Sequence, residues 1–135
     1  MRIGTRVIGT ALAGALLAVG GASQAMAQAK YSASTSLSNG RLSTSISQED
    51  KTQPDGSAFW QLQDVYEKTG GGTITAQFGF NYHGYSYNRD WSDQSVNQTK
   101  DAWFWDLGFN DCQNVIGWMA VKGQNTFYNA PVTIC

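Results

Sequence analysis

The sequence predicts an all-β, mainly antiparallel fold: a small, single-domain β-sandwich or barrel with one disulfide. Three features support this prediction. Apolar and polar residues alternate over short segments, turn-forming residues separate those segments, and two cysteines follow an export signal. Strict alternation turns one side of a strand to a core and the other side to solvent. We therefore expect one β domain over residues 28–135.

Residues 1–27 have the pattern of a secretory signal peptide. Arg2 and Arg6 precede an apolar run, and small residues ending in Ala25-Met26-Ala27 follow it. The run is shorter than the roughly 20 residues that cross a bilayer. We expect a secreted, extracellular protein of bacterial type with no membrane span.

Charge and cysteine content narrow the choice of partners. Removal of residues 1–27 leaves seven basic and ten acidic residues, a formal net charge of −3, so we expect no nucleic-acid partner. Cys112 and Cys135 are the only cysteines, and export favours a disulfide between them. With one histidine and no C-x-x-C sequence, we expect neither a metal nor another cofactor.

The first predicted element is a hairpin over residues 31–47. Its strands alternate around Asn39-Gly40, a dipeptide that favours a type I′ turn and would set Leu37 opposite Leu42. The other side of the hairpin is rich in serine, as in the stems of pore-forming toxins. We favour a solvated sheet face, because the apolar side is too weak for a barrel wall in lipid.

Two further segments follow. Residues 57–68 fit one short helix with Phe59, Leu62 and Tyr66 on one face, or a strand with Trp60, Leu62 and Tyr66 on one face, and we favour the strand. Residues 74–82 alternate without ambiguity and predict a half-buried strand. Its inward side chains are those of Ile74, Ala76, Phe78, Phe80 and Tyr82.

The last two segments are predicted strands as well. Residues 101–109 alternate, with Trp103, Trp105, Leu107 and Phe109 on one side. For the C-terminal hairpin we expect a four-residue loop closed by Val121 and Thr126, which sets Cys112 opposite Cys135. This register also places Pro131 at a non-hydrogen-bonded pair, as required because proline has no N–H to donate. The predicted core side is Val115, Met119, Val121, Tyr128, Ala130, Val132 and Ile134.

Residues 81–91, NYHGYSYNRDW, form the predicted binding site. Tyr82 ends the preceding strand and Gly84 permits a turn. The stretch has no aliphatic residue, and each buried tyrosine would need a partner for its hydroxyl, so we expect an exposed aromatic surface. Its predicted binding residues are Tyr85, Tyr87, Trp91, His83, Arg89 and Asp90.

Catalysis has weaker support in the sequence. A nucleophilic triad would have to use His83, and no G-x-S-x-G sequence is present. A two-carboxylate glycosidase could use Asp64 with Glu67, or Asp90 with Asp93. Such spacing is also common at exposed turns.

Two other site chemistries are weaker still. A ribonuclease-like site could use His83, Glu67 and Arg89, although an acidic domain repels RNA. Calcium could bind aspartates, but their spacing matches no known calcium loop and turn or capping roles explain them. The aspartates concerned are Asp90, Asp93, Asp101, Asp106 and Asp111.

We therefore predict a small secreted recognition module of the carbohydrate-binding or hydrolase-inhibitor type. Its partner would be an extracellular glycan or a secreted protein, bound by the aromatic surface. A small secreted hydrolase is one alternative. An antibacterial or pore-forming toxin that uses residues 31–47 is the other.

Overall fold

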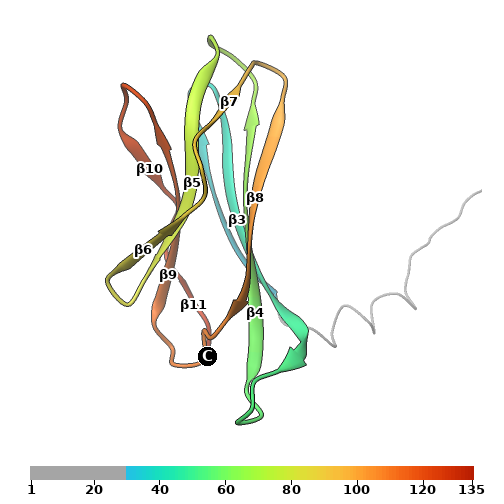
Figure 1. Ribbon diagram of the computed structural model, residues 1–135. Coiled ribbons are helices and arrows are strands. Elements are labelled where there is room, and N and C mark those ends of the chain that lie inside the picture. The colour runs from blue at the N-terminus through green and yellow to red at the C-terminus, as the bar shows by residue number, and fades with distance from the viewer. Residues whose placement is uncertain (1–29) are drawn as a thin grey trace, which may run out of the picture.

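A computed structural model describes residues 30–135, and the predicted signal peptide over residues 1–27 lies outside the described residues. The described chain has no helix and folds into two antiparallel sheets that face each other (Figure 1). This confirms the predicted all-β fold and is consistent with a small sandwich. No helix within residues 30–135 is long and apolar enough to cross a membrane.

The first sheet has the strand order β2-β3-β4-β8. Its strands are β2 (Lys30–Leu37), β3 (Gly40–Thr52), β4 (Ala58–Lys68) and β8 (Thr99–Leu107). β4 covers most of the segment that could have been a short helix, and the preferred strand assignment is correct. Trp60, Leu62 and Tyr66 are buried along one side of it, as that assignment requires.

The second sheet has β9 and β5 at its centre. Its strands are β5 (Ile74–Tyr82), β6 (Tyr85–Asn88), β7 (Ser92–Gln94), β9 (Asn114–Val121), β10 (Thr126–Tyr128) and β11 (Val132–Thr133). β6 and β7 pair with different parts of β5, and β10 and β11 pair with different parts of β9. The short β6 is therefore an edge strand of this sheet.

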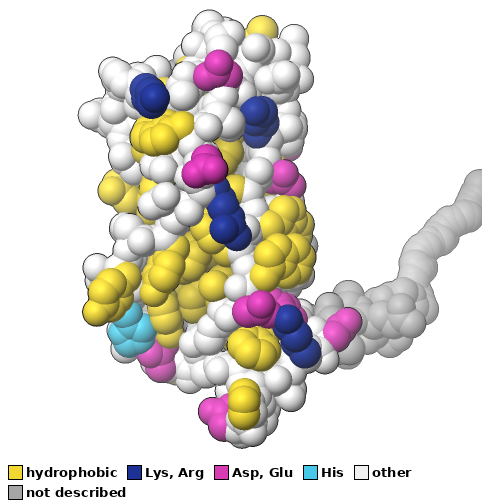
Figure 2. All heavy atoms as spheres, in the orientation of Figure 1, with side chains coloured by type: hydrophobic (Ala, Val, Ile, Leu, Met, Phe, Trp, Pro, Cys, Tyr) yellow, Lys and Arg dark blue, Asp and Glu magenta, His cyan; other side chains and the backbone are white. Residues whose placement is uncertain are grey.

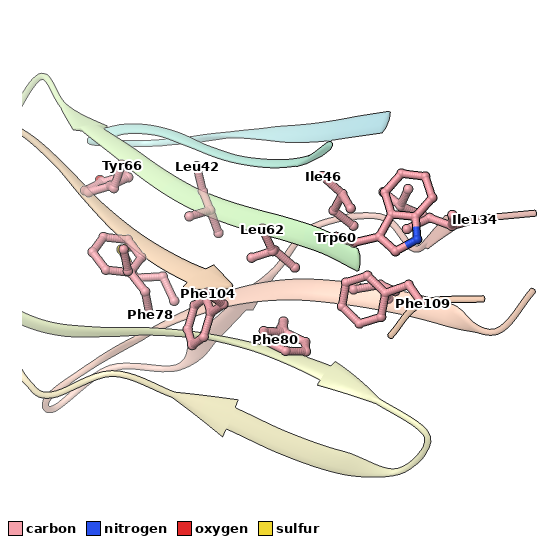
Figure 3. Close-up of a cluster of buried hydrophobic side chains, with 14 of the residues drawn as sticks. Leu42, Ile46, Trp60, Leu62, Tyr66, Phe78, Phe80, Phe104, Phe109 and Ile134 are labelled. Atoms are coloured by element: carbon pink, nitrogen blue, oxygen red, sulfur yellow. The ribbon is translucent and has the colours of Figure 1, made fainter. Parts of the chain in front are cut away.

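A hydrophobic core fills the space between the sheets. Figure 3 shows its large side chains pointing toward one another from both sheets. Phe80 on β5 meets Phe104 on β8 edge to face, with ring centroids 4.9 Å apart. The fully enclosed core residues include Leu42, Ile46, Leu62, Phe80, Val115 and Met119. Removal of this apolar area from water is the main stabilising contribution.

A cluster of three polar side chains lies inside this core. Thr44 donates a 2.7 Å hydrogen bond to Asp64 Oδ1 and accepts a 2.8 Å bond from Asn129 Nδ2, and all three side chains are buried. Burial raises the pKa of Asp64 to about 8, although the bond from Thr44 opposes the shift. Burial therefore favours the neutral, protonated form of Asp64 in the folded chain.

The turn of the first hairpin differs from the prediction. Leu37 pairs with Gly40 and Thr35 with Leu42, so Ser38 and Asn39 form the turn. Gly40 begins β3 and serves a close approach, since a Cβ there would lie 2.3 Å from the Glu67 carbonyl oxygen. The shift is two residues, which leaves the predicted side chains on the inner face.

A bulge in β8 changes the predicted faces of residues 101–109. Leu62 pairs with Phe104 but Trp60 pairs with Leu107, because β8 has one extra residue there. Trp105 stays exposed, whereas Leu107 packs against the core. The prediction of one common face for residues 103, 105, 107 and 109 is therefore wrong.

The predicted strand pairing of the C-terminal hairpin is correct at one end only. Val132 pairs with Val115, and the disulfide joins Cys112 to Cys135 with Cα atoms 4.8 Å apart, as predicted. At the other end Thr126 pairs with Ala120 instead of Val121, so the loop has five residues. As a result Tyr128 and Ala130 are exposed, and Phe127 turns toward the core in their place.

Candidate functional site

The β5–β6 hairpin projects from the edge of the second sheet, at the lower left of Figure 1. His83 and Gly84 form its two-residue turn, with φ angles of 54° and 77°. Such left-handed pairs suit the twist of a tight hairpin. Tyr85 pairs with Tyr82 and Tyr87 with Phe80, so these side chains share the side of the hairpin that faces the first sheet.

A groove lies between this hairpin and the end of β8. We call it the edge groove; it has a volume of about 260 Å³. Tyr87 stacks on Phe80 with centroids 4.8 Å apart, and Tyr82 packs against Phe109 at 4.7 Å. Its lining residues are Phe80, Tyr82, Tyr87, Asp106, Leu107, Gly108 and Phe109. Figure 2 shows exposed hydrophobic side chains on this face, near the cyan histidine.

Asp111 fixes one end of the edge groove. Its Oδ2 contacts His83 Nε2, and its Oδ1 accepts a 2.5 Å hydrogen bond from the Tyr82 hydroxyl. The bonds from Tyr82 and His83 lower the pKa of the Asp111 carboxyl. Burial, followed by the bond to Asp111, raises the pKa of Tyr82. The groove thus has a rigid polar rim with an ionised carboxylate.

Arg89 closes the middle of the same edge. Its guanidinium lies 4.5 Å above the Phe104 ring and its Nε donates a 2.9 Å hydrogen bond to the Trp103 carbonyl oxygen. These contacts join β8 to the segment after β6. We therefore assign Arg89 a structural role, with its outer surface still exposed to a ligand.

A second hollow lies on the outer face of the first sheet. We call it the tryptophan cleft; it has a volume of about 500 Å³ and is lined by Gln48, Glu49, Asp50, Lys51, Gln61 and Trp105. Trp105 is exposed and stacks on Trp103 with centroids 4.9 Å apart. The face of the Trp105 indole that is not stacked on Trp103 therefore lies beside the amide and charged side chains of the cleft.

The edge groove and the tryptophan cleft meet at Asp106. Asp106 lines the groove, while Lys51, which lines the cleft, forms an ion pair with its carboxylate. The backbone N–H of Asp106 also donates a 2.8 Å hydrogen bond to Glu49 Oε2, another cleft residue. The two hollows are therefore neighbours across the β8 bulge.

The predicted binding residues are all exposed, but they do not form one cluster. His83, Tyr85 and Tyr87 lie together on the hairpin. Trp91 stands instead against Lys122, whose Nζ is 5.3 Å from its ring centroid. Whether these residues bind a ligand stays a prediction.

Sequence reasoning missed two features of this region. Asp111 was considered only as a possible calcium ligand, because a distance of 28 positions hides its contact with His83. The tryptophan cleft was missed because the β8 bulge separates Trp105 from Leu107. The alternation of Trp103, Trp105 and Leu107 was visible, but alternation alone does not reveal a bulge.

The two alternative catalytic sets that need Glu67 are not assembled. Asp64 is buried in the core, whereas Glu67 is exposed on β4. Glu67 also lies near the end of β4 opposite to the His83 turn (Figure 1). Among the described residues, no group of three or more histidine, cysteine or acidic side chains could hold a metal ion. Both cysteines are in the disulfide.

No protein-family model, curated protein or solved structure matches this chain. Its function must therefore be argued from the chemistry of the hollows described above.

Proposed function

We propose that the protein is an extracellular recognition module that binds a neutral glycan. The observation that carries the proposal is the meeting of two aromatic hollows at Asp106. Each hollow combines a rigid aromatic wall with hydrogen-bonding side chains, the usual composition of a small-ligand site. The extracellular location rests on the predicted signal peptide and agrees with the disulfide.

The chemistry of the hollows favours sugar rings. The apolar C–H face of a pyranose packs on an aromatic ring, while its hydroxyls need acceptors and donors around the rim. Trp105 in the tryptophan cleft and Tyr87 in the edge groove offer such rings. Asp106 and Asp111, whose side chains are 56% and 45% exposed, offer carboxylate acceptors.

Charge and dimensions narrow the ligand further. Glu49, Asp50 and Asp106 outnumber Lys51 in the lining of the two hollows, and residues 28–135 have a formal net charge of −3, so an acidic polysaccharide would be repelled. The hollows are separate and lie side by side, which suits a chain of several sugar rings better than one ring. A flat protein partner would be expected to meet a broader continuous surface.

Titration with neutral oligosaccharides of increasing length tests the proposal. We expect binding that strengthens from one to about four sugar rings and then levels off, and that is weaker for acidic oligosaccharides. Trp105→Ala should reduce the gain from added rings, because it removes one aromatic wall. Equal binding of neutral and acidic chains, or capture of a secreted protein with no glycan binding, would contradict the proposal.

A further inference from the structure

A pocket separate from both hollows lies beside the β2–β3 turn and the β9–β10 turn. Figure 1 shows these turns toward the end of the sandwich away from the marked C-terminus. We call this pocket the end pocket. It opens between the β2–β3 turn and the β9–β10 turn, where Ser38, Asn39 and Gln124 form an exposed polar rim. Its volume is about 90 Å³. Since a water occupies roughly 30 Å³ of liquid, the space suits about three to five non-hydrogen atoms.

Lys68 is the unusual residue of the end pocket. It is 2% exposed, and its Nζ has one hydrogen-bond partner among the described residues, the Gly70 carbonyl oxygen. No carboxylate of the described chain forms an ion pair with it. A lysine is almost never fully buried unless its charge is paired. Its ammonium has three donors, so two are left for another acceptor.

Tyr66 supplies a second polar group to the same pocket. Its side chain is 3% exposed and lines the pocket. Tyr66 and Lys68 are two positions apart on β4, so both side chains stand on the inner face. The phenol and the ammonium therefore come from the same wall of the pocket.

The rest of the wall is apolar. It is built from Leu37, Ile74, Met119, Val121 and Phe127. These side chains come from both sheets, so the pocket continues the core outward. An anion alone would satisfy Lys68 but would leave the apolar wall without a partner, while a hydrocarbon alone would leave the ammonium unpaired.

We infer that the end pocket binds a short-chain carboxylate of two or three carbon atoms, the size of acetate or propionate. The carboxylate pairs with Lys68 Nζ and accepts a hydrogen bond from the Tyr66 hydroxyl. The hydrocarbon tail packs on the apolar wall. This binding is independent of the proposed glycan binding, because no lining residue is shared with the edge groove or the tryptophan cleft.

Titration with acetate, propionate, butyrate and octanoate at constant ionic strength tests the inference. The readout is the chemical shift of the Met119 methyl group. We expect saturable binding that is about fourfold tighter for propionate than for acetate, because one methylene is added. Butyrate and octanoate should bind no tighter than propionate, since their tails exceed the volume of the pocket. Propionamide, which has the same shape as propionate without the charge, should bind at least tenfold more weakly than propionate.

Lys68→Met should weaken propionate binding at least tenfold, while Lys122→Met, a change at an exposed lysine near the same end, should leave it unchanged. If Lys68→Met does not fold, Ile74→Phe provides the test, because it fills the pocket and keeps the lysine. Ile74→Phe should abolish the propionate response. Absence of saturable binding, equal affinity for propionate and propionamide, or undiminished binding by either pocket variant would overturn the inference.

Discussion

Phe80 and Tyr85 stand on the same side of the β5–β6 hairpin, yet Phe80 is 1% exposed and Tyr85 is 68% exposed. Phe80 lies on β5, where β8 and the loop after it cover the sheet. Tyr85 lies on β6, which has no strand of the first sheet opposite it. The same type of side chain therefore stabilises the fold in one region and is available to a ligand in the other.

Removal of a core aromatic should have the largest effect. Phe104 contacts Phe80 edge to face and also carries the Arg89 guanidinium. Phe104→Ala should lower the free energy of unfolding by roughly 3 to 5 kcal/mol, because a large cavity remains between the sheets. Urea unfolding measures the loss. A loss below about 1 kcal/mol would mean that the core and the edge do not differ as described.

The disulfide should contribute nearly as much. Cys112 and Cys135 are 23 positions apart, and closure of a loop of this length stabilises a fold by about 3 kcal/mol in the chain-entropy model. Thermal unfolding with and without reductant should show a markedly lower midpoint after reduction. An unchanged midpoint would show that β9 and β11 hold together without the bridge.

The buried carboxyl of Asp64 should make the free energy of unfolding depend on pH. Asp64 keeps its proton in the folded chain up to about pH 8 but ionises near its ordinary pKa of 3.8 when unfolded. The folded state thus binds more protons between these values, so stability falls as pH rises through this range. From about pH 5 to about pH 7 the loss should be roughly 2 to 3 kcal/mol.

Asp64→Asn is the matched comparison for this prediction, because the amide has nearly the same shape and does not ionise. Urea unfolding of the variant at both pH values should show a smaller fall than the unchanged protein shows. Equal falls in the two proteins would assign the pH dependence to other groups. Asp111 and Asp55 change the free energy of unfolding mainly at lower pH, since their pKa values are lowered.

The exposed hairpin should tolerate truncation best. Tyr85→Ala should cost less than about 1 kcal/mol, as is usual for exposed positions. Tyr87→Ala should cost more, roughly 1 to 2 kcal/mol, because its ring stacks on Phe80. Urea unfolding of the two variants decides the order. A loss of several kcal/mol from Tyr85→Ala would assign that side chain to the core.

The alternation of single strands was enough to predict most of the core. Phe78 and Phe80, for example, are buried as their spacing requires, because a strand between two layers has one protected side. The errors lie where one residue is added to a strand or turn. The extra residue in β8 changes the face of Leu107, and the five-residue loop before Thr126 exposes Tyr128. Such insertions depend on tertiary contacts that alternation does not contain.

The candidate site could be predicted in part for the same reason. The exposure of Tyr85 follows from a local absence of aliphatic residues. The opposite wall of the edge groove comes from residues 106–109, and its rim is fixed by Asp111. These residues lie 21 or more positions beyond Tyr85, so their approach to the hairpin depends on how the two sheets pack.

The most direct test compares glycan binding by Tyr87→Ala and Tyr128→Ala in the oxidised protein. Both replace an exposed tyrosine; Tyr87 lines the edge groove, whereas Tyr128 is 54% exposed on β10, outside the edge groove and the tryptophan cleft. Isothermal titration with the tightest-binding neutral oligosaccharide should show at least a tenfold loss of affinity for Tyr87→Ala and little change for Tyr128→Ala. Equal affinities, with both variants folded, would contradict recognition at the edge of the sandwich.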